Sequence, residues 1–316
     1  MTDLVQQQIR LHSAHDLDAR VPPTALGEVL RLLEPAVRKS VRMAFEGRST
    51  ARGRSPAWLG ASTIIRLAGV ELGRRDTTLL FESPRFGDAA PSLYEQTEMF
   101  PTGLPDAQYT GFDMLAGVLS RIGRADAADS DRYDRSLLGG IATFDKGLNG
   151  TFQSLELMQT GTHAAQVLDG CLIERARELR NRTPSPRAVR LLATLDMLRV
   201  STGSLGLKLD DGNEVRGVVS EDGLPTAQDF LGAQVLVHGR AVYRASGRLL
   251  RIDVDAIESG EGAPTLWARV PEPIRASLTP QQLSASGPQT GGVAAFFGRW
   301  PGDETEDELV ASLQEL

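Results

Sequence analysis

Five β-rich segments between residues 187 and 258 constrain the fold of this chain more than any other feature. Asp211-Gly212 and Ser246-Gly247 are typical of tight turns, and a short helical pattern at residues 225–231 separates the third segment from the fourth. Three strands, a helix and two further strands are the order of an OB-like barrel, and a small SH3-like barrel is the alternative. The expected strands cover residues 188–199, 203–210, 213–220, 233–244 and 248–257.

The segment before this barrel predicts several helices and one β-hairpin. Apolar residues recur at helical spacing between Pro23, which suits a first helical turn, and Gly47, which suits a helix end. Two β-rich runs within residues 62–82 predict the hairpin, whereas residues 1–22 are polar and predict no firmly held element. Further patterns predict helices at residues 112–122, 133–144 and 170–182, and a strand near residues 152–158.

Changes in composition divide the chain into three parts. Thr-Pro-Ser-Pro at residues 183–186 marks one boundary, and the sequence becomes rich in Pro, Ser, Gln and Gly after Ser259. We therefore predict an α+β protein. It has mixed helices and a hairpin over residues 1–183, an OB-like barrel over residues 184–260, and an extended arm ending in a short helix over residues 261–316.

The composition argues against several functional classes. The 34 Lys and Arg residues against 41 Asp and Glu residues give a net charge of −7, so only a local basic patch suits a polyanion. Cys171 is the single cysteine, which excludes a disulfide framework, and its place at the start of an apolar helix predicts a core position. The four histidines form no ligand pattern, and no nucleotide-binding or nucleophile motif occurs. We therefore expect no metal, no cofactor and no enzymatic activity.

The N-terminal residues lack the basic-then-apolar order of a signal peptide, and no apolar stretch is long enough to span a membrane. These features predict a cytoplasmic protein that does not contact a membrane. Arg supplies almost all of the positive charge, because Lys occurs only at positions 39, 146 and 208. This bias indicates a GC-rich genome, and we expect a bacterial source.

An aromatic cluster stands out in the otherwise polar C-terminal arm. Phe296, Phe297 and Trp300 lie within five positions of one another, and Arg299 lies between them. Aromatic and Arg side chains are the types that anchor protein interfaces. The cluster therefore predicts burial, either against a partner or against the core of this chain.

A short helix is expected directly after this cluster. Thr305 and Glu308 form a capping-box pattern, and Leu309 and Leu313 then share one helix face. A helix of this length is marginal in water by itself. We therefore expect its apolar face to lie on a surface.

Residues 296–316 resemble the C-terminal tail of antitoxins that neutralise PIN-domain ribonuclease toxins in type II toxin–antitoxin pairs. In that family an aromatic-Gly-x-Trp-x-Gly-Asp-Glu run, followed by an acidic short helix, wraps the toxin. The resemblance implies that Arg299 approaches the carboxylates that hold the toxin's metal ion, where a guanidinium satisfies them with paired donors. It also implies that a hydrophobic groove of the toxin receives Phe296, Phe297, Trp300, Leu309 and Leu313.

An Arg-rich stretch is the candidate nucleic-acid contact. It runs from the first predicted helix into a loop of Gly and Arg residues, and guanidinium groups in such a stretch bind phosphates. The alternative is a solvated helix face, because no aromatic residue interleaves with the cations. The stretch contains Arg38, Lys39, Arg42, Arg48, Arg52 and Arg54.

Together these features predict an antitoxin-like protein that binds and silences a PIN-domain ribonuclease through its arm. The alternative is a nucleic-acid-binding module that uses the OB-like barrel and the Arg-rich stretch, with the acidic tail as its own inhibitor. The sequence leaves the oligomeric state open.

Overall fold

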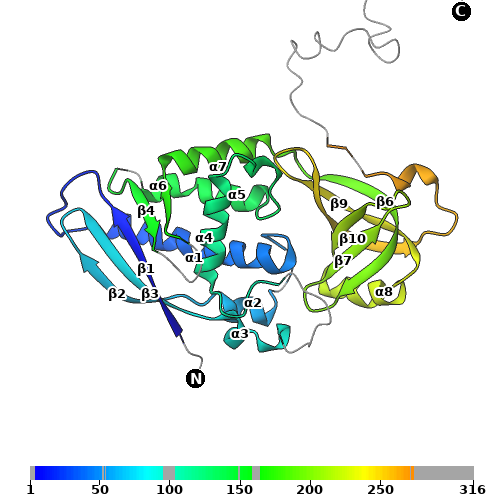
Figure 1. Ribbon diagram of the computed structural model, residues 1–316, viewed down its shortest axis with the longest axis horizontal. Helices are drawn as coiled ribbons and strands as arrows, with labels where there is room; N and C mark the ends of the chain where they lie inside the picture. Colours follow the sequence, from blue (N-terminus) through cyan, green and yellow to red (C-terminus); the bar gives the residue numbers. More distant parts are fainter. Residues whose placement is uncertain are drawn as a thin grey trace, which may run out of the picture. The chain divides into compact units, whose positions relative to one another are not determined.

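The computed structural model describes residues 4–51, 53, 55–94, 104–148, 150–158, 164–270 and 272–273, and the chain divides into two units, residues 1–274 and 275–316. The described residues have an α+β fold, as predicted, in which a five-stranded sheet with helices precedes a closed five-stranded barrel (Figure 1). The expected terminal helix lies outside the described residues. So do the residues expected to bind a partner, which are Phe296, Phe297, Arg299, Trp300, Leu309 and Leu313.

The N-terminal sheet consists of β1 (Leu4–His12), β2 (Arg66–Leu72), β3 (Asp76–Pro84), β4 (Ser154–Leu157) and β5 (Gln166–Asp169). The strand order is β2-β3-β1-β4-β5, and every neighbouring pair is antiparallel. The central strand β1 therefore contradicts the expectation of no firmly held element before residue 23. Ile9 and Leu11 are buried and alternate with more exposed polar residues, so a period of two outweighs the polar composition.

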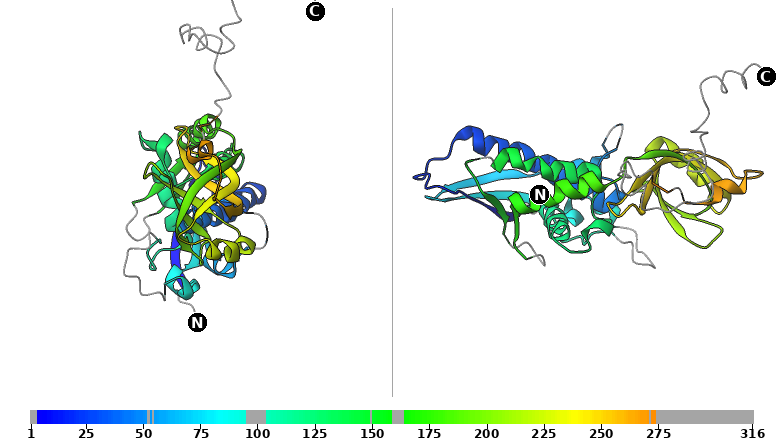
Figure 2. Two further views of the ribbon diagram at one scale, coloured as in Figure 1. Left: turned by 90° about the vertical axis from the view of Figure 1, so that its right-hand side faces the viewer. Right: turned by 90° about the horizontal axis from the view of Figure 1, so that it is seen from above.

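Helices cover the buried face of this sheet (Figure 2). The longest of them begins at Pro23 and is followed by Gly47 at a φ of 74°, as predicted from the proline and the glycine. The described helices of this part are α1 (Pro23–Glu46), α2 (Ala57–Ser62), α3 (Phe86–Ala89), α4 (Gly111–Ile122), α5 (Arg135–Ala142), α6 (Phe144–Leu148) and α7 (Gly170–Arg182). None of the helices in the described part of the chain has the length and apolarity to cross a membrane.

Cys171 is exposed at the start of α7, so its predicted core position is wrong. Asp169 caps this helix, with its carboxylate accepting a hydrogen bond from the Leu172 amide at 2.9 Å. The buried face of α7 carries Ile173 and Ala176. Cys171 lies off that face, because a helix turns by about 100° per residue.

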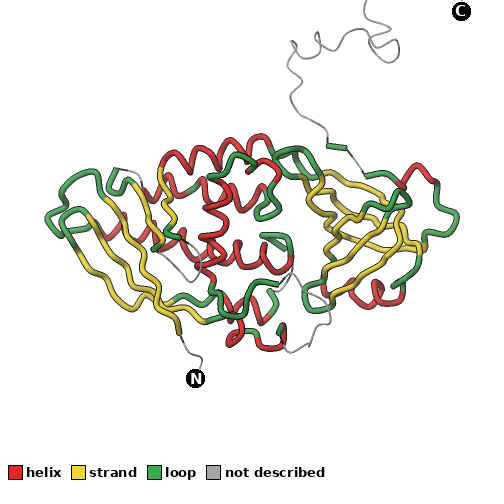
Figure 3. Tube along the Cα trace, viewed as in Figure 1, coloured by secondary structure: helices red, strands yellow, loops and turns green. Residues whose placement is uncertain are grey.

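The barrel consists of β6 (Arg187–Arg199), β7 (Ser204–Lys208), β8 (Glu214–Val218), β9 (Gln234–Tyr243) and β10 (Leu249–Ser259), with α8 (Leu224–Asp229) between β8 and β9. The closed order is β10-β8-β7-β6-β9, and β10 also pairs with β9. The β8–β10 pair is parallel and the other pairs are antiparallel. The strands of the barrel form a group apart from the strands of the sheet (Figure 3). Leu191, Leu207 and Ile252 belong to a hydrophobic core that is separate from the core under the sheet.

The turn between β9 and β10 joins the barrel to the helical part. The Ser246 amide donates to the Ala128 carbonyl at 2.7 Å, and the Ser246 hydroxyl donates to the Asp129 carboxylate at 3.0 Å. Apolar residues at this end of the hairpin also enter the hydrophobic core of the helical part. They are Val242, Ala245 and Leu250.

Candidate anion-binding groove

A buried ion pair holds the barrel against the helices. Asp134, the N-cap of α5, accepts hydrogen bonds from the Ser49 amide at 3.0 Å and from Nη2 of Arg251 on β10 at 3.3 Å. Both charged side chains are only 4% exposed. Burial opposes ionisation of Asp134, but the Arg251 guanidinium and the hydrogen bonds from Ser49 outweigh it and hold the pKa of Asp134 below its usual value. The charged form of Asp134 therefore fixes where β10 lies against α5.

Gly47 at the end of α1 is a second point of contact with the barrel. Its carbonyl accepts a hydrogen bond from Nη1 of Arg251 at 3.0 Å. A Cβ atom at this position would lie 2.4 Å from Cζ of Arg216 on β8, so the Arg216 side chain packs directly over the glycine. Two guanidinium groups thus meet the carboxyl end of a helix, where the helix dipole favours positive charge.

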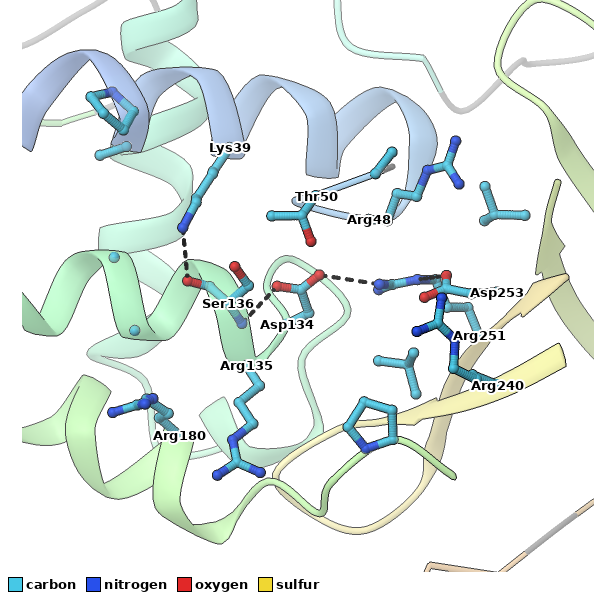
Figure 4. A pocket seen from close by; sticks show the side chains of 18 of the residues that line it. Lys39, Arg48, Thr50, Asp134, Arg135, Ser136, Arg180, Arg240, Arg251 and Asp253 are labelled. Atoms are coloured by element: carbon cyan, nitrogen blue, oxygen red, sulfur yellow. Dashed lines mark hydrogen bonds and ion pairs between the residues drawn. The ribbon is translucent and has the colours of Figure 1, made fainter. Parts of the chain in front are cut away.

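A groove of about 1120 Å³ lies between these elements (Figure 4). One wall comes from α1, α5, α6 and α7, and the opposite wall comes from β8, β9, β10 and the residues that follow β8. Four carboxylates line it, at Asp134, Asp222, Asp253 and Asp255. Twice as many cations line it, namely Arg31, Lys39, Arg48, Arg135, Lys146, Arg180, Arg240 and Arg251.

Four cations of the helical wall form no salt bridge in the described part of the chain, although the charge of one of them, Lys146, acts on Glu28. Lys39 Nζ donates to the Ser136 carbonyl at 3.3 Å, and Nη1 of Arg135 donates to the Ser185 hydroxyl at 2.7 Å. Within the described residues, Lys39, Arg135, Lys146 and Arg180 form no ion pair. This wall therefore presents a positive surface in a chain whose net charge is −7.

Apart from Arg135, the residues of α5 and its C-cap that line the groove have small side chains. Ser136, Gly139, Gly140 and Thr143 recur at helical spacing along the helix. A Cβ at Gly139 would lie 3.3 Å from Nε of Arg180, and a Cβ at Gly140 would lie 3.7 Å from the Lys39 ammonium. A glycine inside a helix costs about 0.5–1 kcal/mol relative to alanine, so two adjacent glycines need a reason. Gly139 lets Arg180 lie close to the helix surface, whereas a Cβ at Gly140 would make only ordinary contact with Lys39.

The barrel wall has mixed charge. Nε of Arg251 donates to Asp253 at 2.7 Å, and Arg240 lies 3.9 Å from Asp255. Each of these cations is therefore at least partly neutralised by a neighbouring carboxylate. The attraction for an anion comes mainly from the helical wall.

The structure disperses the predicted Arg-rich stretch. Lys39 and Arg48 line the groove, whereas Arg38 is half-buried on α1 and does not. Arg42 and Arg48 bind the two carboxylate oxygens of the buried Glu46 through their Nε atoms, at 3.2 and 2.7 Å. Two further members, Arg52 and Arg54, lie outside the described residues.

Sequence reasoning missed the other cations of the helical wall. Arg135, Lys146 and Arg180 come from separate helices more than ninety positions after Lys39, and no local pattern joins them. The adjacent glycines of α5 were the available signal, because a helical apolar pattern rarely tolerates two of them without a packing reason. In the described part of the chain, no group of three or more His, Cys, Asp or Glu side chains is placed to hold a metal ion.

Comparisons of this chain with protein-family models, with curated proteins and with solved structures gave no match. A function is therefore inferred from the charges and the volume of the groove.

Proposed function

We propose that the groove binds a single-stranded nucleic acid through its phosphates. The supporting observation is the helical wall, where Lys39, Arg135, Lys146 and Arg180 gather from four helices and no carboxylate of the described residues pairs with them. Such a wall gives the sequence-independent attraction on which strand binding depends. A volume of about 1120 Å³ slightly exceeds the range of about 300–1000 Å³ typical of small-molecule pockets, which suits a few nucleotides of a flexible strand.

We also propose that the barrel is OB-like. The parallel β8–β10 pair that completes the barrel and the position of α8 between the third and fourth strands support this assignment. OB-folds commonly bind strands through aromatic side chains on their second and third strands, but β7 and β8 carry none. We therefore place strand binding in the groove beside the barrel.

Fluorescence anisotropy with a labelled single-stranded oligonucleotide tests the proposal over a range of salt concentrations. Each phosphate contact contributes about 0.7 to the slope of log affinity against log salt for a single strand. Arg180→Gln is expected to weaken binding and to lower that slope by about 0.7. The matched control is Arg177→Gln, because Arg177 lies on the same helix but pairs with Glu174 and Asp145 outside the groove.

The proposal fails if the native chain shows no salt-dependent binding. An equal loss in the Arg177→Gln control would also contradict it, because the effect would then come from net charge rather than from the groove.

A second candidate function comes from the arm. We propose that Phe296, Phe297, Arg299 and Trp300 bind a PIN-domain ribonuclease, as the resemblance of residues 296–316 to antitoxin tails implies. The division of the chain at residue 274 supports this, because it separates residues 275–316 from the unit that contains both hydrophobic cores. A pull-down that compares the full chain with a chain ending at Gly292 tests it, and equal recovery of the ribonuclease from both would overturn it.

A further inference from the structure

A smaller cavity of about 290 Å³ adjoins the groove. Its lining comes from the end of α1, from α2, and from the residues that precede β7 and follow β8. Arg48, Ser220 and Asp222 line both cavities, so the smaller cavity lies directly beside the groove.

An aromatic ring lies in its wall. Trp58, on α2, is half-buried, and its ring centroid lies 5.0 Å from that of Phe45, which is buried in the core. The contact with Phe45 fixes the orientation of the indole ring. A fixed indole that lines a cavity favours a flat ligand, because stacking on such a ring needs no further ordering of the side chain.

A buried hydroxyl in the same wall has no protein partner. Thr202 is only 5% exposed, and its Oγ1 forms no hydrogen bond within the described structure. Leaving a buried polar group without a partner is unfavourable, so such groups are uncommon in native proteins. A ligand with a hydrogen-bonding edge would satisfy it.

The charges around this cavity favour a polar heterocycle over a simple anion. Arg42 and Arg48 use their Nε atoms on Glu46, and their terminal nitrogens have no hydrogen-bond partner among the described residues. Two exposed carboxylates, Glu221 and Asp222, line the cavity as well. The lining therefore offers donors and acceptors together, which suits the edge of a nucleobase.

We infer that the smaller cavity takes one unstacked nucleobase of the strand bound in the groove. The base stacks on Trp58, and the Thr202 hydroxyl forms a hydrogen bond with its edge, while the flanking phosphates stay on the helical wall. This inference rests on the proposed function of the groove. The groove contacts only the phosphates of the strand, whereas the smaller cavity would contact a base.

The test compares a single-stranded oligonucleotide with an abasic deoxyribose-phosphate strand of equal length, both added to the full chain. Base stacking on an aromatic side chain predicts that the base-bearing strand binds about tenfold tighter. Trp58 fluorescence is followed in a Trp267→Phe, Trp300→Phe background, and only the base-bearing strand is expected to quench it. Arg180→Gln serves as the control, because it should weaken both strands by the same factor.

Thr202→Val separates a ligand contact from a structural one. Because the hydroxyl has no partner in the described structure, this nearly isosteric change should leave the melting temperature unchanged or raise it. The advantage of the base-bearing strand over the abasic strand should nevertheless fall by about threefold, the size of one hydrogen bond. Trp58→Leu should remove most of that advantage. Unchanged binding of the abasic strand to this variant would show that the protein is still folded and binds phosphates.

Equal binding of the two strands without quenching of Trp58 would overturn this inference and leave the groove proposal intact. A clear loss of stability in Thr202→Val would also overturn it, because the hydroxyl would then have a structural partner. If neither strand binds, the groove proposal and this inference both fail.

Discussion

At the scale of single residues, the contact between helices and barrel depends on Gly47 and Asp134. Gly47 adopts a positive φ, and its carbonyl and its missing side chain accommodate Arg251 and Arg216. Asp134 supplies the buried charge that pairs with Arg251. The sequence predicts the helix end at Gly47 from local signals alone. It cannot predict that two arginines from beyond residue 200 pack there, because that depends on tertiary structure.

Gly47→Ala is expected to destabilise the protein by about 2 kcal/mol or more. The left-handed conformation costs a residue with a Cβ about 1–2 kcal/mol, and the new Cβ also displaces Arg216. Thermal denaturation measures the effect. Gly27→Ala is the matched control, since Gly27 lies in the interior of α1 with nothing within 4 Å of the added Cβ. The control should gain about 0.5–1 kcal/mol, and an equal loss in both variants would contradict the assignment.

Asp134→Asn is expected to lower the free energy of unfolding at pH 7 by about 1–3 kcal/mol, because it removes one of the two carboxylates that pair with the buried Arg251 and leaves only Asp253. Asp145→Asn, at an exposed ion pair, is the control and should change it by less than about 1 kcal/mol.

The Asp134 carboxyl also makes the free energy of unfolding depend on pH. The folded pKa of Asp134 lies below the value of about 3.9 for an unfolded chain, so its stabilisation is complete above that pH. The stabilisation is lost as the pH falls through the lower, folded pKa. Urea unfolding should therefore show that the difference between native and Asp134→Asn proteins shrinks with acidification below about pH 4. A difference that stays constant with pH would contradict the role of the charge.

At the scale of elements, α5 combines a structural end with a functional face. Its N-cap Asp134 binds the barrel, while Gly139 and Gly140 lie under the cations of the groove. Helix periodicity predicts one helix over residues 133–144, and the structure forms α5 within that range, because its buried apolar face is local in sequence. The prediction misses the break at Thr143, after which Phe144 begins α6. The groove itself was not predictable in this way, because its cations come one or two at a time from four helices. In β1, by contrast, the sequence does contain the alternation of buried and exposed residues that is typical of a strand. The polar composition of residues 1–22 concealed it.

Gly139→Ala should separate stability from binding. Removing a helical glycine is expected to stabilise the fold by up to about 1 kcal/mol, because the Arg180 side chain that the new Cβ approaches is able to move. Moving Arg180 away from the helix surface should weaken oligonucleotide binding severalfold. Melting temperature and anisotropy are measured on the same samples. Gly60→Ala on α2, where nothing lies within 4 Å, should leave binding unchanged. Unaltered binding in Gly139→Ala would show that the glycine does not serve the groove.

At the scale of the whole molecule, the arm proposed to bind a ribonuclease begins close to the groove proposed to bind nucleic acid. Nη1 of Arg187 donates to the Glu272 carbonyl at 2.9 Å, and the adjacent Pro186 lines the groove. Glu272, in the first part of the predicted arm, therefore lies beside the basic surface. Residues 303–308 carry five carboxylates. A random coil of the intervening length would span about 30 Å, and tethers of that span give local concentrations in the millimolar range.

We therefore expect that a chain ending at Gly292 binds single-stranded nucleic acid several times more tightly than the full chain, most clearly at low salt. Anisotropy titrations on the two chains measure this. A full-length variant in which the five carboxylates of residues 303–308 become amides separates charge from length, and it should behave like the shortened chain. Weaker binding by the shortened chain would show that the arm contributes to strand binding rather than competing with it.

The hairpin of β9 and β10 makes the two halves of the fold depend on each other. Val242, Ala245 and Leu250 complete the hydrophobic core of the preceding half, although they belong to strands of the barrel or to the turn between them. Cutting the gene at the proline-rich junction would leave both products with unsatisfied apolar surface. We therefore expect recombination between the halves to be unfavourable, so that homologues carry sheet and barrel together even where the arm differs.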